Sequence, residues 1–164
     1  DRRVKVLALD GWQALRSLLP PPERRGLTLV DPPFEQSGEL VRLSEGLAAA
    51  LDRFQGGTFV LWYPIKDPKP VARFHRAVQE IAAERKLESV LAVDMLVQAP
   101  RNPERLNGCG VIVANPPYTL ASELAVALPW LAGVLAQGSG HDSRLAELGS
   151  AAPADAPKSR LANT

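Results

Sequence analysis

Two short stretches of this 164-residue chain each place a polar side chain, two prolines and an aromatic side chain after an apolar run: "DPPF", 31–34, and "NPPY", 115–118. In the first, the Asp31 carboxylate and the Pro32 backbone carbonyl are two acceptors for one amino group. An amino nitrogen conjugated to a ring is a poor nucleophile, and two fixed acceptors favour the pyramidal form with a free lone pair. Phe34 adds a flat face for stacking a nucleobase. Taken alone, the stretch is equally typical of a turn after a strand.

Alternating strands and helices must position these residues. Apolar runs rich in β-branched residues predict strands, and apolar side chains at helical spacing predict helices between them. The predicted strands are 4–10, 27–31, 58–64, 89–98 and 110–115, and the predicted helices are 11–19, 40–54, 71–81 and 120–135. Strands alternating with helices indicate an α/β protein with a parallel sheet covered on both faces.

Composition bounds the remaining possibilities. The chain is 46% hydrophobic and 23% charged, with a net charge of +1, a balance ordinary for a globular protein and too neutral to indicate nucleic-acid binding by itself. A single cysteine, Cys109, excludes an internal disulfide, and we expect a cytoplasmic location with no membrane contact. His75 and His141 lack partner acids at metal spacing, so no metal is expected. Residues 137–164 are rich in Gly, Ser, Ala and Pro and predict a flexible tail after one domain, 1–136.

One connection departs from the alternating pattern. Residues 99–109, "APRNPERLNGC", contain two prolines and are too short and broken for a crossover helix, so the last two strands should form an antiparallel hairpin. A mostly parallel sheet with a reversed last strand resembles the Rossmann-like sheet of class I methyltransferases, which use S-adenosylmethionine. Their strand order is 3-2-1-4-5-7-6. On this resemblance the chain has strands 3 to 7 and lacks strands 1 and 2.

Strand counting separates the two Pro-Pro corners. Amino-methyltransferases of this class carry Asp/Asn/Ser-Pro-Pro-aromatic after strand 4, with three strands to follow. Three predicted strands follow Asp31, whereas only a helix and a tail follow Asn115. We therefore predict that Asp31, Pro32, Pro33 and Phe34 form the catalytic corner. The "NPPY" stretch is interpreted as a rigid strand-to-helix turn.

Three longer stretches are similar to the RlmJ family of ribosomal RNA large subunit methyltransferases: "DGWQALRSLLPPPERRGLTLVDPPFE", "GTFVLWYPIKD" and "GVIVANPPYTLASELAVALPWL". The resemblance implies methyl transfer from S-adenosylmethionine to an adenine N6 amine of large-subunit (23S) ribosomal RNA. It implies a catalytic role for Asp31 and cofactor contacts from Asp10, Gly11 and Asp31. We expect Phe34, Tyr63 and Lys66 to contact the substrate; Phe34 stands where the family commonly has tyrosine.

The chain also departs from this family. No glycine-rich loop follows a strand before Asp10, and the family's N-terminal part, with its cofactor loop, has no counterpart here. We therefore expect a segment of an enzyme that binds the methyl donor poorly as it stands, with ribosomal RNA as partner and a monomeric state. The alternatives are a non-catalytic scaffold that lacks the donor site, or a DNA adenine or protein glutamine methyltransferase, because an amide or amino nitrogen needs the same acceptors.

Overall fold

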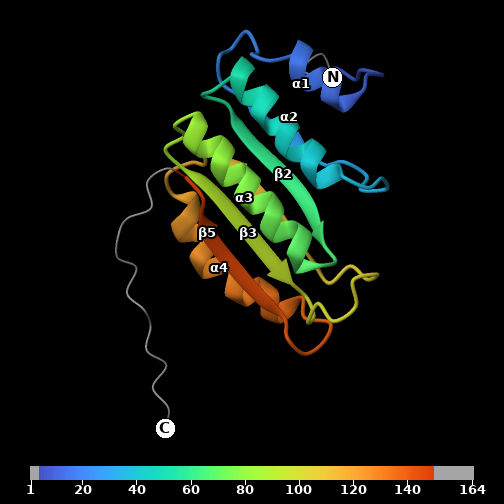
Figure 1. Cartoon of the computed structure of the whole chain (residues 1–164). Helices are drawn as coiled ribbons and strands as arrows, with labels where there is room; N and C mark the ends of the chain where they lie inside the picture. The colour runs from blue at the N-terminus through green and yellow to red at the C-terminus, as the bar shows by residue number, and fades with distance from the viewer. Residues whose placement is uncertain (1–3, 150–164) are drawn as a thin grey trace.

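A five-stranded sheet forms the centre of the molecule, with helices on both faces (Figure 1). The computed structural model describes residues 4–149. In chain order the elements are α1 (Gly11–Ser17), β1 (Leu27–Val30), α2 (Glu39–Arg53), β2 (Thr58–Ile65), α3 (Pro68–Glu84), β3 (Val90–Leu96), β4 (Gly108–Ala114), α4 (Leu120–Val134) and β5 (Asp142–Glu147). Among these residues no helix is long and apolar enough to cross a membrane.

The strand order is β1-β2-β4-β3-β5. β1 and β2 are parallel, whereas β4 runs antiparallel to both of its neighbours, β2 and β3. The predicted hairpin of the last two apolar strands is therefore confirmed as β3 and β4. The reversed strand β4 lies between β2 and β3, which is the order expected for the final four strands of the class I sheet.

Two parts of the expected sheet are wrong for the described residues. The sheet is not mostly parallel, because the inserted β4 creates two antiparallel pairings and β5 adds a third beside β3. The expected strand 4–10 is also absent: this segment is irregular and exposed, with Val6 89% accessible. A strand needs a hydrogen-bonding neighbour, and β1 pairs only with β2 in the described chain.

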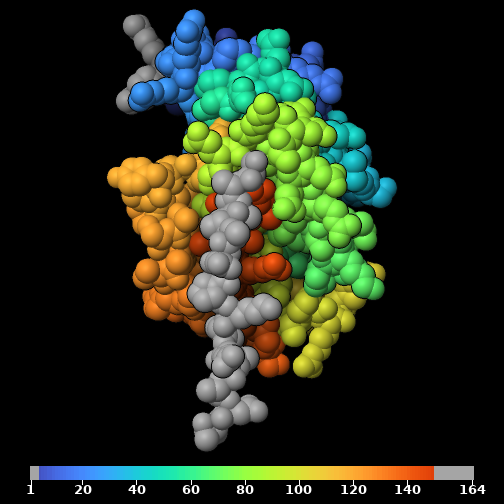
Figure 2. Space-filling view, turned by 60° about the vertical axis from the view of Figure 1, so that its left-hand side comes forward, coloured from blue at the N-terminus to red at the C-terminus, as the bar shows by residue number. Residues whose placement is uncertain are grey.

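The expectation of a flexible tail from Gln137 is corrected over its first part. Residues 142–147 form β5, an edge strand antiparallel to β3. Glu147 fastens this strand, since its Oε1 accepts the Val90 backbone N–H at 2.7 Å and its Oε2 accepts the Ser89 hydroxyl at 3.0 Å. Figure 2 shows β5 in red between α3 in green and α4 in orange. The rest of the predicted tail, 150–164, lies outside the described residues.

Helices α2 and α3 cover one face of the sheet, and α4 packs on the other face against β3 and β5 (Figure 1). Odd-numbered side chains of β2 point into the larger core, which includes Leu43, Leu47, Leu51, Phe59, Leu61, Tyr63, Phe74 and Val78. The apolar stripe predicted along residues 40–54 therefore lies on the buried side of α2.

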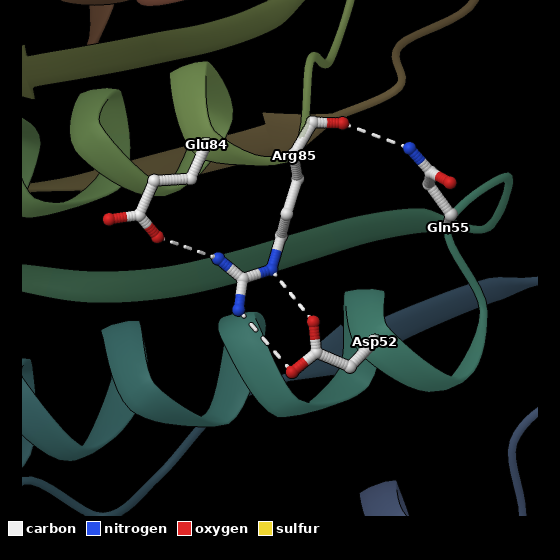
Figure 3. A network of polar contacts seen from close by, with 4 residues as sticks. All are labelled: Asp52, Gln55, Glu84 and Arg85. Carbon is white, nitrogen blue, oxygen red and sulfur yellow. Dashed lines mark hydrogen bonds and ion pairs between the residues drawn. The ribbon is translucent and has the colours of Figure 1, made fainter.

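The carboxyl ends of α2 and α3 are tied together by one arginine (Figure 3). The Arg85 guanidinium donates to both carboxylate oxygens of Asp52, at 3.0 and 3.3 Å, and to Glu84 at 3.2 Å. Gln55 donates to the Arg85 carbonyl at 2.9 Å. This network holds the amino-terminal edge of β2, opposite the edge at which the candidate site lies.

Candidate active site

The "DPPF" corner stands directly after β1, at the carboxyl edge of the parallel strands, where such sheets bind ligands. Asp31 is exposed, whereas Pro32 is buried and anchors the corner. Phe34 has φ of +53°, a left-handed conformation that a bulky side chain rarely adopts. Its ring packs edge-on against Trp62 at 5.7 Å between centroids. Strain of this kind persists where the surroundings fix it, and it concentrates at functional sites.

Two pockets flank this corner. The first, which we call the Asp10 pocket, has a volume of about 750 Å³ and includes Asp10, Gly11 and the segment 31–33 in its wall. The second, the Phe34 pocket, has a volume of about 560 Å³ and includes Phe34 and Lys66. The residues expected to contact the cofactor and two of those expected to contact the substrate, Phe34 and Lys66, thus line separate, adjacent pockets, with Asp31 and Phe34 on either side.

Asp10 has a structural role at its position. Its Oδ1 caps α1 by accepting the Gln13 backbone N–H at 3.0 Å, and its Oδ2 lies 4.0 Å from the Arg42 guanidinium. Arg42 also lies over the Trp12 ring, 5.0 Å from its centroid. Gly11 has no atom within 4 Å of where a Cβ would stand, so the wall of the Asp10 pocket is open at that point.

The structure separates two expected substrate contacts, Tyr63 on β2 and Lys66 directly after it. Lys66 is exposed and lines the Phe34 pocket, and its substrate contact stays a prediction. Tyr63 is fully buried and lines neither pocket, so the expected substrate contact of Tyr63 does not fit the structure. Because side chains alternate along a strand, Trp62 takes the opposite face and meets Phe34.

Tyr63 instead belongs to a polar network inside the protein. Its hydroxyl donates to Asp94 Oδ1 at 2.6 Å and lies 2.8 Å from His75 Nε2. Burial, reinforced by the Asp94 carboxylate, raises the pKa of Tyr63, so the phenol stays protonated. Burial lowers the pKa of His75, the Asp94 charge opposes this shift, and Arg144 adds to it.

Glu39 is a candidate site residue that sequence reasoning missed. It begins α2, is only 6% exposed, and lines both the Asp10 pocket and the Phe34 pocket. Its Oε2 is buried and has no hydrogen-bond partner among the described residues. A signal was present in the sequence, because Glu39 lies four residues before Leu43 and so shares the buried face of the helix.

The second Pro-Pro corner has a different conformation and a different position. Here the left-handed residue is Asn115, with φ of +52°. Its side-chain amide donates to the carbonyls of Gln55 and Gly57, both at 2.8 Å. Since β4 runs antiparallel to β2, the corner lies at the opposite edge of the sheet from Asp31. These contacts support its interpretation as a rigid turn.

Comparisons with known proteins place the chain in a family. The family model described as "Ribosomal RNA large subunit methyltransferase D, RlmJ" matches residues 1–146. The chain therefore belongs to the RlmJ family, which confirms the resemblance found in the sequence.

Individual relatives support the same assignment. The chain is 33% identical over 142 residues to ribosomal RNA large subunit methyltransferase J of Escherichia coli (strain K12), which covers 86% of this chain and 49% of that protein. The protein of the same name from Haemophilus influenzae is 29% identical over 141 residues, 85% of this chain and 49% of that protein. The crystal structure of protein LPL1258 from Legionella pneumophila str. Philadelphia 1 superposes with a TM-score of 0.74 at 30% identity, covering 87% of this chain and 50% of that one. The chain spans about half the length of the curated relatives it matches.

Proposed function

We propose that this chain forms the acceptor-binding part of a methyltransferase that acts on an adenine N6 amine of large-subunit ribosomal RNA. The observation that carries the proposal is the Asp31–Phe34 corner between two pockets, one on the side of Asp10 and one on the side of Lys66. Membership of the RlmJ family supports ribosomal RNA as the substrate. A DNA adenine or a protein glutamine would need the same two acceptors, and both are included in the test.

The corner's own groups would position the amine. The Asp31 carboxylate and the Pro32 carbonyl accept its two N–H hydrogens, which favours a pyramidal nitrogen with its lone pair directed away from the ring. Proline at 33 removes a backbone N–H that would compete for those acceptors. Phe34 offers its face to the base after the base leaves its stack, a contact of about 1–3 kcal/mol in comparable sites.

S-adenosylmethionine would supply an electrophilic methyl group from the Asp10 pocket. A volume of about 750 Å³ suits a nucleoside-sized molecule. The exposed Asp10 carboxylate is an acceptor for a base amine, and Gly11 permits close approach. These residues fit the adenosine part of the donor.

The test is a methyl-transfer assay with labelled S-adenosylmethionine on protein-free large-subunit RNA, assembled subunits, duplex DNA and a glutamine-containing protein. It uses this chain and a form extended on the N-terminal side. We expect label on adenine N6 of the RNA, and Asp31→Ala should lower the rate by about 10²-fold or more, because one of two charge-positioning acceptors is lost.

A matched pair of aromatic variants separates the two corners. Phe34→Ala should weaken RNA methylation by about 5- to 150-fold, the equivalent of a lost stacking contact. Tyr118→Ala, at a side chain 98% exposed in the second corner, should leave the rate unchanged. Equal effects of the two variants would contradict the assignment. Transfer to none of the four substrates from either form would favour a non-catalytic scaffold.

A further inference from the structure

The loop between β3 and β4, residues 97–107, is held in one shape by a buried asparagine. Asn107 is 1% exposed. Its side-chain nitrogen lies 2.8, 2.9 and 3.1 Å from the carbonyls of Lys66, Asn102 and Arg105, and its side-chain oxygen accepts from Gln98 at 3.1 Å. A buried, fully partnered amide specifies one backbone arrangement, so the loop is fixed to the end of β2.

A second segment, residues 137–140, supports the same loop from the other side. The Gln137 N–H donates to the Val97 carbonyl at 2.8 Å, and the Ala99 N–H donates to the Ser139 carbonyl at 2.9 Å. Gly140 has φ of +78°, and a Cβ there would stand 2.7 Å from the Ala99 Cβ, so only glycine allows this approach. The two segments enclose a hollow of about 210 Å³, the Arg101–Arg105 notch, lined by Gln98, Arg101, Asn102, Arg105 and Ser139 among others.

The notch carries exposed positive charge. Arg101 and Arg105 are exposed, and within residues 4–149 neither guanidinium makes an ion pair or a hydrogen bond. The next pocket along the edge, the Phe34 pocket, adds Lys66 and Arg73, and Pro103 of the same loop reaches into its wall. Cations held without internal partners on a rigid loop are suited to phosphate groups, which arginine binds through paired N–H donors.

The notch also lies at the same edge of the sheet as the catalytic corner. Gly108, at the start of β4, is opposite Ile65 at the end of β2 and Leu96 at the end of β3. The loop before Gly108 therefore stands beside the carboxyl ends of the parallel strands, as Asp31 does. A nucleic-acid strand with one base in the Phe34 pocket would continue past this loop.

We propose that the Arg101–Arg105 notch binds backbone phosphates of the RNA strand that carries the target base, and that Asn107 positions the loop for this contact. The inference rests on the proposed function, because it assumes that RNA is the substrate. Single-stranded RNA is the expected occupant, since a base must leave its stack to reach Phe34.

The experiment measures binding of a labelled single-stranded RNA of about 15 nucleotides to the purified chain by fluorescence anisotropy, over a series of salt concentrations. Arg101→Glu with Arg105→Glu should weaken binding at least 10-fold near 0.1 M salt. It should also reduce the slope of log K against log[salt] by about 1.4, the value for two lost phosphate contacts on a single strand.

The matched control is Arg25→Glu with Lys86→Glu. Each exchange removes two units of charge, so both double variants lower the formal net charge from +1 to −3. Arg25 and Lys86 are exposed and precede β1 and β3, at the opposite edge of the sheet. The control should lose much less affinity. Asn107→Ala should weaken binding while keeping both guanidinium groups, with folding checked by circular dichroism.

Equal losses in the two double variants would overturn the inference, because bulk charge would then explain binding. The same holds if the unmodified chain does not bind RNA. The outcome is separable from the proposed function, because anisotropy measures RNA binding and the methyl-transfer assay measures the chemistry. A chain that methylates RNA but keeps full affinity in the Arg101 and Arg105 variant would refute only the phosphate site.

Discussion

At the scale of single residues, Glu39 is the one acidic or basic side chain in residues 4–149 that is buried. Its Oε2 has no partner there, although it lies where two pockets meet. An unsatisfied buried charged group costs about 1–3 kcal/mol or more, and the position at the start of α2 offsets only about 0.3–1 kcal/mol of this. Such a cost is typical of a residue kept for a ligand rather than for stability.

Glu39→Met should therefore raise the free energy of unfolding by about 1 kcal/mol, because it removes the unpartnered carboxylate and keeps the volume. It should also lower methyl transfer by the extended form. Urea denaturation measures the first effect. Glu45→Met, at an exposed position on the same helix, is the control and should stay within about 0.5 kcal/mol of the unmodified chain. A destabilised Glu39→Met variant would mean that the carboxylate has a partner in the folded protein.

Some site residues could be predicted from the sequence and others could not. A strand ending in Asp31 was enough to place the corner at a sheet edge. The substrate contact expected of Tyr63 does not fit the structure, because "TFVLWYPI" is apolar on both faces and alternation alone gave no direction. Glu39 was missed because the helical stripe was traced from Leu40, through apolar residues only.

At the scale of elements, the Tyr63, His75 and Asp94 network joins β2, α3 and β3 through side chains rather than backbone. Tyr63 also lies directly over Gly110 of β4, where a Cβ would stand 2.4 Å from the ring. The close approach requires glycine at that position. The network therefore fixes α3, whose first turn borders the Phe34 pocket, against three adjacent strands.

The network should give stability a pH dependence. Burial lowers the pKa of His75 in the folded state. As the pH falls past the ordinary pKa of histidine, His75 therefore takes up its proton in the unfolded chain first. The stability that neutral His75 contributes is therefore fully present above about pH 6.5, and it is lost as the pH drops towards the pKa of His75 in the folded state. His75→Gln, which cannot titrate, should lose less stability between about pH 7.5 and pH 5.5, measured by urea denaturation at each pH. Parallel losses in both proteins would show that other groups dominate.

The elements that were predicted correctly are those whose own residues show the pattern of a strand, a helix or a short connection. The hairpin of β3 and β4 followed from a connection too short for a helix. β5 was missed because "DSRLAE" is polar and short, and its strand form comes from pairing with β3. The segment 4–10 shows the converse, since its β-branched apolar residues favour a strand but nothing in the described chain pairs with it.

At the scale of the whole molecule, the β1 side of the sheet lacks cover among residues 4–149. β1 is an edge strand whose Leu27 and Leu29 are 67% and 64% exposed, and both line the Asp10 pocket. The relatives are about twice as long as the region they share with this chain. Among the described residues, the wall of the Asp10 pocket therefore ends at the unpaired edge of β1.

We therefore expect weak binding of S-adenosylmethionine by this chain, with a dissociation constant above about 0.1 mM, equivalent to less than about 5.5 kcal/mol. Isothermal titration calorimetry checks this value, and the form extended on the N-terminal side should bind more tightly. Asp10→Ala in the extended form should weaken binding again if Asp10 contacts the donor. A micromolar dissociation constant for this chain would contradict the expectation and mean that the Asp10 pocket is sufficient.

The position of β4 has a consequence for how the protein emerges from the ribosome. β2 and β3 are synthesised first, yet they never pair with each other, because β4 must enter between them. A nascent chain that ends before Gly108 therefore leaves one edge of β2 and both edges of β3 unpaired, because β4 and β5 are still to be made. The sheet closes only when Ile65 of β2 pairs with Gly108 of β4, and all of α3 and β3 lies between these two residues in the sequence. Such long-range pairing is slow to form, so the sheet stays open until the chain has been translated to residue 114.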